Sequence, residues 1–323
     1  MKDNVARTAL FAIALSAFAF DAHAQTTDKP LRVILPVSAG SGVDTIVRAI
    51  GPQLGKALGQ PVVIENLPGA GGITGTSALV KAPADGSTIG VLSNNHVINP
   101  SVFKSLPYDT LNDITPIMVV GSTPFVVVVN PSKLPANNLK ELVALLKAKP
   151  GAYNYASSGN GTIIHLGGAL FADEAGVDIK HVPYKGTGPM VSDLLGGHVD
   201  LGVVAVPAVQ GHLKSGALRA IGVGTDKRIP QLPDVPTMAE QGLPNWTIGG
   251  WFTVAGPPKL PPAEVKRIHA AFTTALATQE VKEAMASQGN IIDPTSPEGA
   301  ARYMRSEQER YAKLINKIGL KPE

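Results

Sequence analysis

Three glycine-rich segments hold the residues best suited to bind a ligand. They are residues 36–44 (PVSAGSGVD), 66–72 (NLPGAGG) and 157–162 (SSGNGT). Each follows a short β-branched run and precedes a helical stretch, which predicts a turn from a strand into a helix. Glycine lets backbone N–H groups approach a ligand closely, and the first N–H groups of a helix are unpaired and lie at its positive end. The segments therefore predict an anion site built from backbone donors.

Such turns also occur where nothing binds, because any α/β protein needs them to join strands to helices. The first and third segments together favour a ligand site, since open α/β folds bind ligands at the carboxyl ends of their strands. A nucleotide site is not indicated. No segment has the Lys-Ser or Lys-Thr of a P-loop, and Gly40-Ser41-Gly42 lacks the third glycine of a dinucleotide fingerprint. Two such turns facing each other across a cleft could instead hold one carboxylate.

Catalytic and metal chemistry find little support in the remaining residues. The chain has no cysteine, its seven histidines are dispersed, and it contains neither a GxSxG elbow nor an HExxH motif. His165 lies one helical turn after Gly161 and could touch a ligand, although a capping or packing role is favoured for it. Asp44 is the other candidate for acid–base chemistry, but a carboxylate there suits the positive end of a helix. We expect a binding protein with no catalytic residue, metal or cofactor.

The length and charge of the chain limit its class and its partners. It has 323 residues, of which 44% are hydrophobic and 16% charged, and a net charge of +3. That length exceeds one ordinary core and predicts two domains. Lys and Arg form no basic tract, so we expect no nucleic-acid partner.

The N-terminus has the three-part pattern of a secretory signal peptide. Lys2 and Arg7 precede the apolar residues 9–20, and Ala22 and Ala24 offer small side chains for cleavage. The apolar run is shorter than the roughly 20 residues that span a bilayer. We therefore expect residues 1–24 to be removed and the rest to be exported to the periplasm as a soluble protein.

Short β-branched runs alternate with helical stretches along most of the chain. The expected strands are residues 31–35, 62–65, 88–92, 125–129, 153–156, 180–182, 201–204, 218–223 and 252–255. The expected helices are residues 43–58, 73–80, 138–149, 163–174, 189–195, 208–215, 262–278, 280–288 and 297–318. This alternation predicts an α/β fold with mainly parallel sheets.

The C-terminal part differs from the rest because its three helices add no new sheet. We therefore expect the tail to pack back onto the first domain. The predicted division is a first lobe of residues 25–128 and 251–323 and a second lobe of residues 129–250. Two chain crossings between the lobes would form a hinge.

Six further motifs resemble those of one protein family. They are residues 63–72 (VIENLPGAGG), 84–88 (ADGST), 106–109 (LPYD), 181–186 (HVPYKG), 193–200 (DLLGGHVD) and 232–237 (LPDVPT), the last followed by Glu240 and Gly242-Leu243-Pro244. In this order and spacing, the chain resembles the TctC/Bug family, the periplasmic solute-binding proteins of tripartite tricarboxylate transport systems. The resemblance covers essentially all of the chain after residue 24.

The resemblance implies a fold, a ligand and partners. The fold would be a two-lobed, type II-like periplasmic-binding-protein fold, each lobe a mainly parallel sheet flanked by helices, with the ligand in the cleft between them. The ligand would be a small organic carboxylate held by backbone amides, hydroxyls and ordered water. Carried over by position, the ligand-binding residues are Val37, Ser38, Ala39, Gly40, Asn94, Ser157, Gly159, Gly161 and Thr162. His165 joins the candidate ligand-binding residues only through its place one helical turn after Gly161. The protein would be a monomer that delivers its ligand to the membrane components of the transporter.

Two departures from the family pattern bear on the ligand. Ser38-Ala39-Gly40 replaces the usual proline-glycine-glycine, which changes the geometry of the first loop. Val204 and Ala205, also expected at the cleft, stand where many relatives carry Asp and often Asn. Valine gives a buried ammonium group no counter-charge, so we expect a mono- or dicarboxylate without an amine, aromatic or aliphatic, ahead of a tricarboxylate such as citrate. Strand alternation leaves open whether Val204 reaches the cleft at all.

Two other functions stay open at this point. A ligand-binding sensor would hand its closed form to a signalling partner rather than to a transporter. An exported enzyme acting on a carboxylated substrate would need His165 and Asp44 as its acid–base pair.

Overall fold

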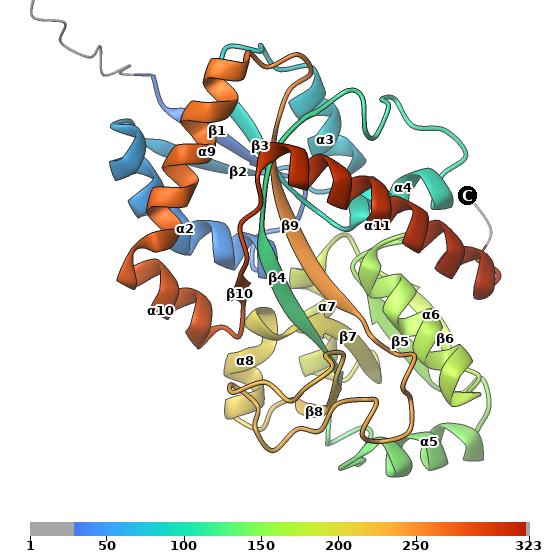
Figure 1. Ribbon diagram of the computed structural model, residues 1–323. Coiled ribbons are helices and arrows are strands. Elements are labelled where there is room, and N and C mark those ends of the chain that lie inside the picture. The colour runs from blue at the N-terminus through green and yellow to red at the C-terminus, as the bar shows by residue number, and fades with distance from the viewer. Residues whose placement is uncertain (1–28, 321–323) are drawn as a thin grey trace, which may run out of the picture.

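The computed structural model describes residues 29–320, which form the two-lobed α/β fold drawn in Figure 1. The signal peptide predicted for residues 1–24 lies outside the described residues. The strands run side by side in the order β2-β1-β3-β9-β4-β7-β5-β6, and β8 and β10 pair with β4. Their bounds are β1 Leu31–Leu35, β2 Val62–Asn66, β3 Thr88–Ser93, β4 Thr115–Val129, β5 Asn154–Ser157, β6 Lys180–Pro183, β7 Leu201–Ala205, β8 Arg219–Val223, β9 Gly249–Gly256 and β10 Ile291–Ile292.

Parallel strands form the outer part of each lobe, as the sequence predicts. In the first lobe β1 pairs with β2 and β3, and in the second lobe β5 pairs with β6 and β7, all in parallel. The two central strands, β4 and β9, are antiparallel to each other and to their other neighbours. The two-lobed α/β architecture is therefore confirmed, with an antiparallel centre added to it.

The strands β4 and β9 run between the two lobes (Figure 1). Residues 115–124 of β4 pair with β9, whereas residues 125–129 pair with β7 and β8. The partner of β4 therefore changes between Pro124 and Phe125, a few residues before the predicted crossing at Val128. We take these two strands as the hinge and keep the lobe boundaries at residues 128 and 250 as a proposal.

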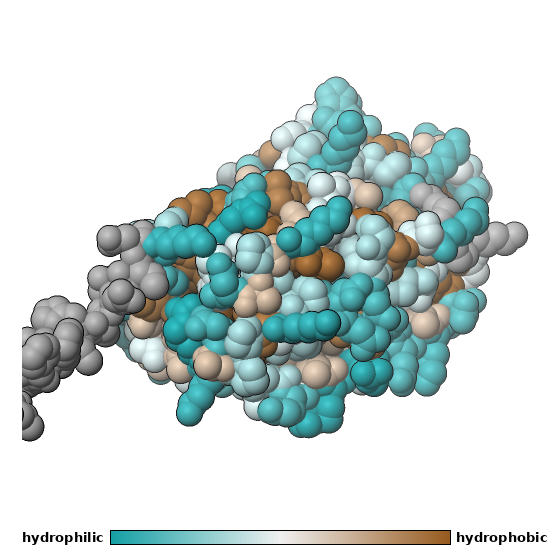
Figure 2. Space-filling model, turned by 90° about the horizontal axis from the view of Figure 1, so that it is seen from above, coloured by the Kyte–Doolittle hydropathy of each residue, from teal (hydrophilic) through white to brown (hydrophobic). Residues whose placement is uncertain are grey.

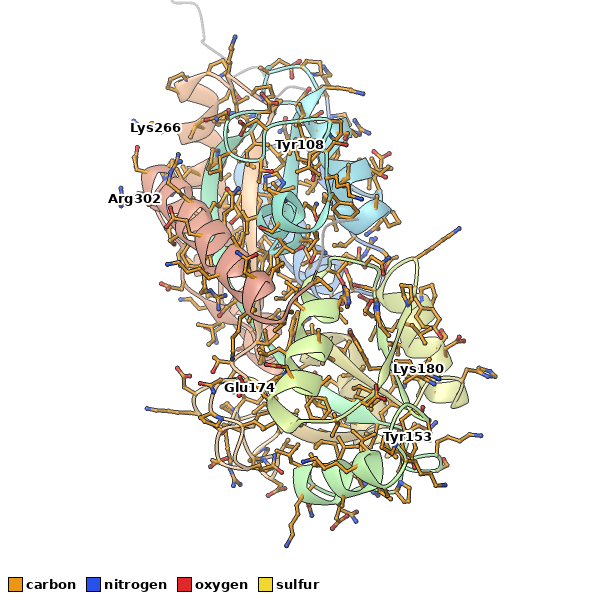
Figure 3. All side chains as sticks on the ribbon, turned by 90° about the vertical axis from the view of Figure 1, so that its right-hand side faces the viewer. Tyr108, Tyr153, Glu174, Lys180, Lys266 and Arg302 are labelled. Carbon is orange, nitrogen blue, oxygen red and sulfur yellow. The ribbon has the colours of Figure 1, made fainter. Side chains whose placement is uncertain are left out.

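Helices cover both lobes. Their bounds are α2 Gly42–Leu58, α3 Ile73–Val80, α4 Asn95–Val102, α5 Leu139–Ala148, α6 Ile163–Ala175, α7 Thr187–Gly196, α8 Val206–Lys214, α9 Pro262–Ala277, α10 Gln279–Ser287 and α11 Pro297–Lys317. The C-terminal helices return to the first lobe, since α9 and α10 pack on α2, and α11 packs on β4 and α4. The far end of α11 reaches the second lobe, where Lys317 Nζ lies 2.6 Å from Glu174 Oε1 on α6 (Figure 3).

Local capping explains why the cleft helices begin where the sequence predicts. Ser41 and Thr162 precede α2 and α6, and each side-chain oxygen accepts a hydrogen bond from the backbone N–H three residues later. Gly59 and Gly176 end the same two helices in the left-handed conformation. Both cleft helices are thus fixed at each end by residues visible in the sequence.

The short strand β10, which the C-terminal part adds to the sheet beside β4, was not expected, nor was the 3₁₀ helix at Ala70–Gly72. Two longer stretches were also not expected, and proline explains both. The first ten residues of β4 contain Pro116, Pro124 and Gly121, and the ladder is irregular beside two of them. Helix α4 contains Pro100. Because proline cannot donate to a ladder or a helical turn, these stretches do not read as a strand and a helix.

The surface is mixed in polarity. The face in Figure 2 scatters hydrophobic residues among hydrophilic ones without one continuous apolar patch. Among residues 29–320, no helix is long and apolar enough to cross a membrane.

Candidate ligand-binding cleft

A cavity of about 520 Å³ lies between the two lobes, a volume typical of small-molecule sites. Four loops at the carboxyl ends of β1, β2, β5 and β6 form most of its wall, and the two ends of α4 complete it. The lining residues are Pro36, Val37, Ser38, Pro68, Gly69, Ala70, Gly71, Gly72, Asn95, Phe103, Ser158, Gly159, Asn160, Thr162, Pro183, Tyr184, Lys185, Gly186 and Thr187. A cavity of about 60 Å³ adjoins it and shares Val37, Asn95, Ser158 and Thr187.

The structure brings about half of the predicted site residues to these cavities. Val37, Ser38, Gly159 and Thr162 line the larger cavity, and Val37, Asn94 and Ala205 line the smaller one. Ala39, Gly40, Ser157, Gly161, His165 and Val204 line neither. Val204 is fully buried in the sheet, where it pairs with Val126. Because successive strand residues point to opposite faces, Ala205 rather than Val204 reaches the cleft.

The first loop is braced by a charged network next to the cavity. The Gly40 N–H donates to Asp44 Oδ2 (2.9 Å), so it is occupied within the protein. Arg48 Nε donates to both oxygens of Asp44, at 3.0 and 3.1 Å, and Asn66 Nδ2 donates to one of them. Burial of the Asp44 carboxyl opposes its ionisation, but the hydrogen bonds from Arg48, Gly40 and Asn66 keep its pKa below the ordinary value. Asp44 is therefore an ionised brace for the loop.

The third loop is braced by neutral groups. Ser157 is fully buried, and its Oγ accepts the Gly159 N–H (3.1 Å) and lies 2.6 Å from His181 Nε2. The Gly161 N–H donates to His165 Nδ1 (3.1 Å). Three donors predicted to face a ligand, the Ser157 hydroxyl and the N–H groups of Gly159 and Gly161, are thus bound inside the protein. Gly161 has φ of +70°, and a Cβ there would lie 2.4 Å from Val102 Cγ2, so only glycine fits.

At the wall of the larger cavity, two hydrogen bonds join the first lobe to the second. Asn95 Oδ1 accepts the backbone N–H of Ile163 (2.8 Å), the first residue of α6. Ser38 Oγ accepts the backbone N–H of Thr187 (3.0 Å), the first residue of α7. Both acceptors line the larger cavity. The lobes therefore meet at the beginnings of two helices, beside the space for a ligand.

Asn94, which the sequence predicts as a ligand-binding residue, instead holds neighbouring elements of the fold together. It is buried, its Oδ1 accepts the N–H of Trp251 (2.9 Å), and its Nδ2 donates to the Gly249 carbonyl and to the Tyr311 hydroxyl. Asn94 thereby ties the end of β3 to β9 and α11. Asn95, next in the chain, is the residue that reaches the larger cavity.

The charge of the cavity favours an anion. None of the described residues that line it is Asp or Glu, and Lys185 is the one charged residue among them. Helices α6 and α7 begin at its wall, which places the positive ends of their dipoles there. Tyr184 presents a neutral ring, because burial and its hydrogen bond to Asp193 (2.7 Å) raise its pKa to about 12.

Comparison with known proteins agrees with this geometry. Residues 46–320 match the family described as the tripartite tricarboxylate transporter family receptor, TctC. The chain belongs to the TctC/Bug family. It is 37% identical to the protein BugT of Bordetella pertussis over 295 residues, which cover 91% of this chain and 90% of BugT.

Solved structures of this TctC/Bug fold have carboxylates bound. The structure of R. palustris Rpa4515 with adipate shares 30% identity with this chain and has a TM-score of 0.88, covering 91% of this chain and 98% of that one. MatC from Rhodopseudomonas palustris with bound malate shares 28% identity with a TM-score of 0.84, covering 88% and 98%. The family is described as a transporter receptor, and a further neighbour with 30% identity and a TM-score of 0.88 is the periplasmic binding protein BugD, so these matches are binding proteins rather than enzymes.

His165 and Asp44, the acid–base pair that an enzyme would need, do not contact each other in the structure and have different partners. Asp44 is bound by Arg48 in the first lobe, and the His165 ring stacks on His181 in the second lobe. Neither Asp44 nor His165 lines the cavity. Ser157 and His181 lie at the distance of a nucleophile and its base, but Ser157 is fully buried and a substrate in the cavity does not reach it.

Sequence reasoning missed two parts of the cavity wall. The sequence marks Pro68–Gly72 as a glycine-rich turn but does not assign it to the site, although all five of its residues line the cavity. The loop from Pro183 to Thr187 is recognised only as part of a family motif and not as cavity wall. Its signal was present, because residues 181–186 (HVPYKG) follow a strand, end in glycine and precede a helix, like the other three loops.

Proposed function

We propose that this TctC/Bug protein captures a small organic carboxylate without an amine in the periplasm. It delivers that ligand to the membrane components of a tripartite tricarboxylate-type transporter. The observation that carries the proposal is the cavity wall, which combines helix N-termini and Lys185 with no carboxylate among its described residues. Residues 1–24 would direct export and be removed from the mature protein, and we expect a monomer.

The anion preference follows from the electrostatics of the wall. Backbone N–H groups at helix beginnings carry partial positive charge and suit carboxylate oxygens. The N–H groups of Ile163 and Thr187 are already bound by side-chain oxygens of Asn95 and Ser38. A carboxylate oxygen accepts a stronger hydrogen bond from an N–H group than a neutral amide or hydroxyl oxygen does. A ligand carboxylate that replaced Asn95 Oδ1 or Ser38 Oγ would therefore bind these N–H groups more strongly.

The exclusion of an amine follows from the neighbouring carboxylates. A buried ammonium group needs a counter-charge, because leaving it unpaired costs several kcal/mol. Asp44 is engaged by Arg48, and Asp193 accepts a hydrogen bond from Tyr184. Ala205, which lines the smaller cavity, offers no charge.

The apolar part of the wall favours an aliphatic or aromatic body. The apolar residues of the cavity wall are Pro36, Val37, Pro68, Ala70, Phe103 and Pro183. A ligand with one or two carboxylates and an apolar middle matches this wall better than citrate. Adipate and malate, the molecules named in the structures of the two neighbours, are both amine-free dicarboxylates.

Calorimetry with matched ligand pairs tests the proposal. We expect glutarate to bind more tightly than glutamate, and adipate or terephthalate more tightly than citrate. A thermal-shift screen can precede it, because a ligand at about 100 times its Kd adds about 2.7 kcal/mol of stability. Tighter binding of glutamate than of glutarate would contradict the exclusion of amines. Turnover of a bound carboxylate would favour the alternative that the protein is an enzyme.

The transport role needs its own test. Cells that produce the membrane components should take up the radiolabelled ligand only when this protein is present. A response in gene expression without any change in uptake would favour a sensor instead.

A further inference from the structure

Two histidine rings stack behind the third loop. The rings of His165 on α6 and His181 on β6 lie 3.8 Å apart between centroids and are inclined by only 6°. Tyr155 on β5 stacks against both, at 6.3 Å from His165 and 5.0 Å from His181. This stack joins three elements of the second lobe at the point where the loop of residues 157–162 leaves the sheet.

Each histidine holds one end of that loop. His181 Nε2 lies 2.6 Å from Ser157 Oγ at the beginning of the loop. His165 Nδ1 accepts the N–H of Gly161 (3.1 Å) near its end. Ser158, Gly159 and Asn160, between these two points, line the ligand cavity.

We propose that His165 and His181 are positioning residues for ligand binding, which hold the third loop in its binding shape only while both rings are neutral. The part of this inference that concerns the ligand rests on the proposed function. Neither ring lines the cavity, so both act through Ser157 and Gly161.

The chemistry of imidazole makes the brace sensitive to protonation. His165 Nδ1 accepts the Gly161 N–H only while it carries a lone pair, and a proton there removes the acceptor. Two positive rings in contact would also repel each other in a partly buried site. Burial, and then the charge of His165, lower the pKa of His181 to about 3, so the neutral form persists in mildly acidic solution.

Few titratable groups among the described residues face the stack. From β5 the facing group is Tyr155, whose pKa is raised by burial, so it stays neutral. From β6 and α6 the facing groups are the two imidazoles themselves. Lys180, labelled in Figure 3, precedes His181 on β6 and is exposed, because successive strand residues point to opposite faces.

Two substitutions of His165 separate positioning from packing. In His165→Phe the aromatic stack is kept and the acceptor for Gly161 is lost. In His165→Asn the side-chain oxygen takes the place of Nδ1, and the group no longer titrates. His198→Asn is the matched control, because His198 is an exposed histidine of the same lobe that lies outside the cavity wall.

The first readout needs no ligand. Amide hydrogen exchange of Gly161, followed by NMR in the chain without residues 1–24, should be about tenfold faster in His165→Phe, because one hydrogen bond is lost. It should be nearly unchanged in His165→Asn and His198→Asn. If His165→Phe folds and the Gly161 amide exchanges at the wild-type rate, the inference is overturned. If His165→Phe does not fold, the inference is overturned when the Gly161 amide exchanges faster in His165→Asn than in the wild type.

The second readout is the affinity for adipate as a function of pH. The titration of adipate itself is common to all variants, so it cancels in the ratio of their Kd values. We expect the ratio of the wild-type Kd to the His165→Asn Kd to rise as the pH falls from about 7 to about 4, most steeply at the acid end, because the neutral form of His181 persists in mild acid. A constant ratio would overturn the pH dependence. If adipate does not bind the wild type at all, the proposed ligand class is wrong, and amide exchange still decides the inference.

Discussion

The first loop of the cleft is braced by charges, whereas the third loop is braced by neutral rings. In the first lobe, Asp44 binds the backbone of Gly40 and is itself held by Arg48. In the second lobe, the stacked pair His165 and His181 holds the ends of the loop. Both loops join a strand to a helix and place glycines beside the cavity.

The difference teaches that one sequence pattern can be stabilised by opposite chemistry. A charged brace between buried Asp44 and half-exposed Arg48 is weakened by salt but tolerates mild acid. The neutral brace formed by His165 and His181 is not affected by salt, but its hydrogen bonds are lost when a ring becomes protonated. Added salt should therefore weaken the first loop and not the third, and mild acid should weaken the third loop and not the first. The following experiments use this contrast.

The largest effect is expected from filling the space at the third loop. In Gly161→Val, a Cβ would lie 2.4 Å from Val102, and the backbone has φ of +70°, which β-branched residues avoid. Overpacking and strain together cost roughly 2–5 kcal/mol, so calorimetry should detect no adipate binding. The matched change in the first loop is Gly40→Ala, where φ is +77° but no atom lies within 4 Å of the new Cβ. Equal losses from the two substitutions would contradict the close packing of the third loop.

The next effect is the loss of stability in acid. The folded-state pKa of His181 is about 3 and that of buried His96 is about 4, both lowered by burial from an unfolded value of 6.5. Below about pH 6.5 the unfolded chain therefore binds more protons than the folded one. The free energy of unfolding should fall by up to about 1.4 kcal/mol per pH unit for each group.

The first loop should respond only at a lower pH. The pKa of Asp44 is lowered from 3.8, so its contribution is complete above about that value and is lost as the pH falls further. Urea titrations of the wild type and of His181→Gln between about pH 7 and about pH 4 should show a shallower decline in the variant. A parallel decline would assign the acid sensitivity to another group.

A moderate effect is expected from removing each brace in turn. Asp44→Asn loses charge-assisted hydrogen bonds and should cost roughly 1–3 kcal/mol of unfolding free energy at low salt, and less at high salt. Ser157→Ala leaves the partners of a buried hydroxyl unpaired and should cost roughly 1–3 kcal/mol at either salt concentration. Urea titrations at the two salt concentrations measure both. The contrast between the loops fails if Ser157→Ala is the salt-sensitive variant.

The smallest effect concerns the one charged residue of the cavity wall. Lys185 is exposed, so Lys185→Gln should weaken adipate binding by only about 0.2–1 kcal/mol, and added salt should remove the difference. The control is Lys180→Gln, because Lys180 is exposed in the same lobe but does not line the cavity. If Lys185→Gln alone abolished binding, a salt bridge rather than backbone donors would anchor the ligand.

Much of the fold could be predicted because periodicity and capping are local properties. Ile46, Ile50 and Leu54 are buried on α2 as their spacing predicts, and Ser41 begins that helix. The first part of β4 could not be recognised, because Pro116 and Pro124 interrupt its pattern and the strand exists through its pairing with β9.

The site was harder to predict because it depends on contacts between distant residues. The sequence locates the loops, but it does not show that Asp44 occupies the Gly40 N–H or that His165 occupies the Gly161 N–H. It also does not show which residues of β7 point toward the cleft. In the structure Ala205 faces the cleft and Val204 does not. These facts follow from tertiary packing rather than from local pattern.

The long strand β4 has a consequence for how the chain folds. Its central partner, β9, comes about 120 residues later in the chain, after the whole of the second lobe. The sheet of the first lobe therefore cannot close until nearly four-fifths of the chain has been made, and closing so long a loop slows folding. Because β4 donates hydrogen bonds in both lobes, neither lobe can melt without exposing an edge of the other. Heating should therefore unfold the two lobes in a single cooperative step.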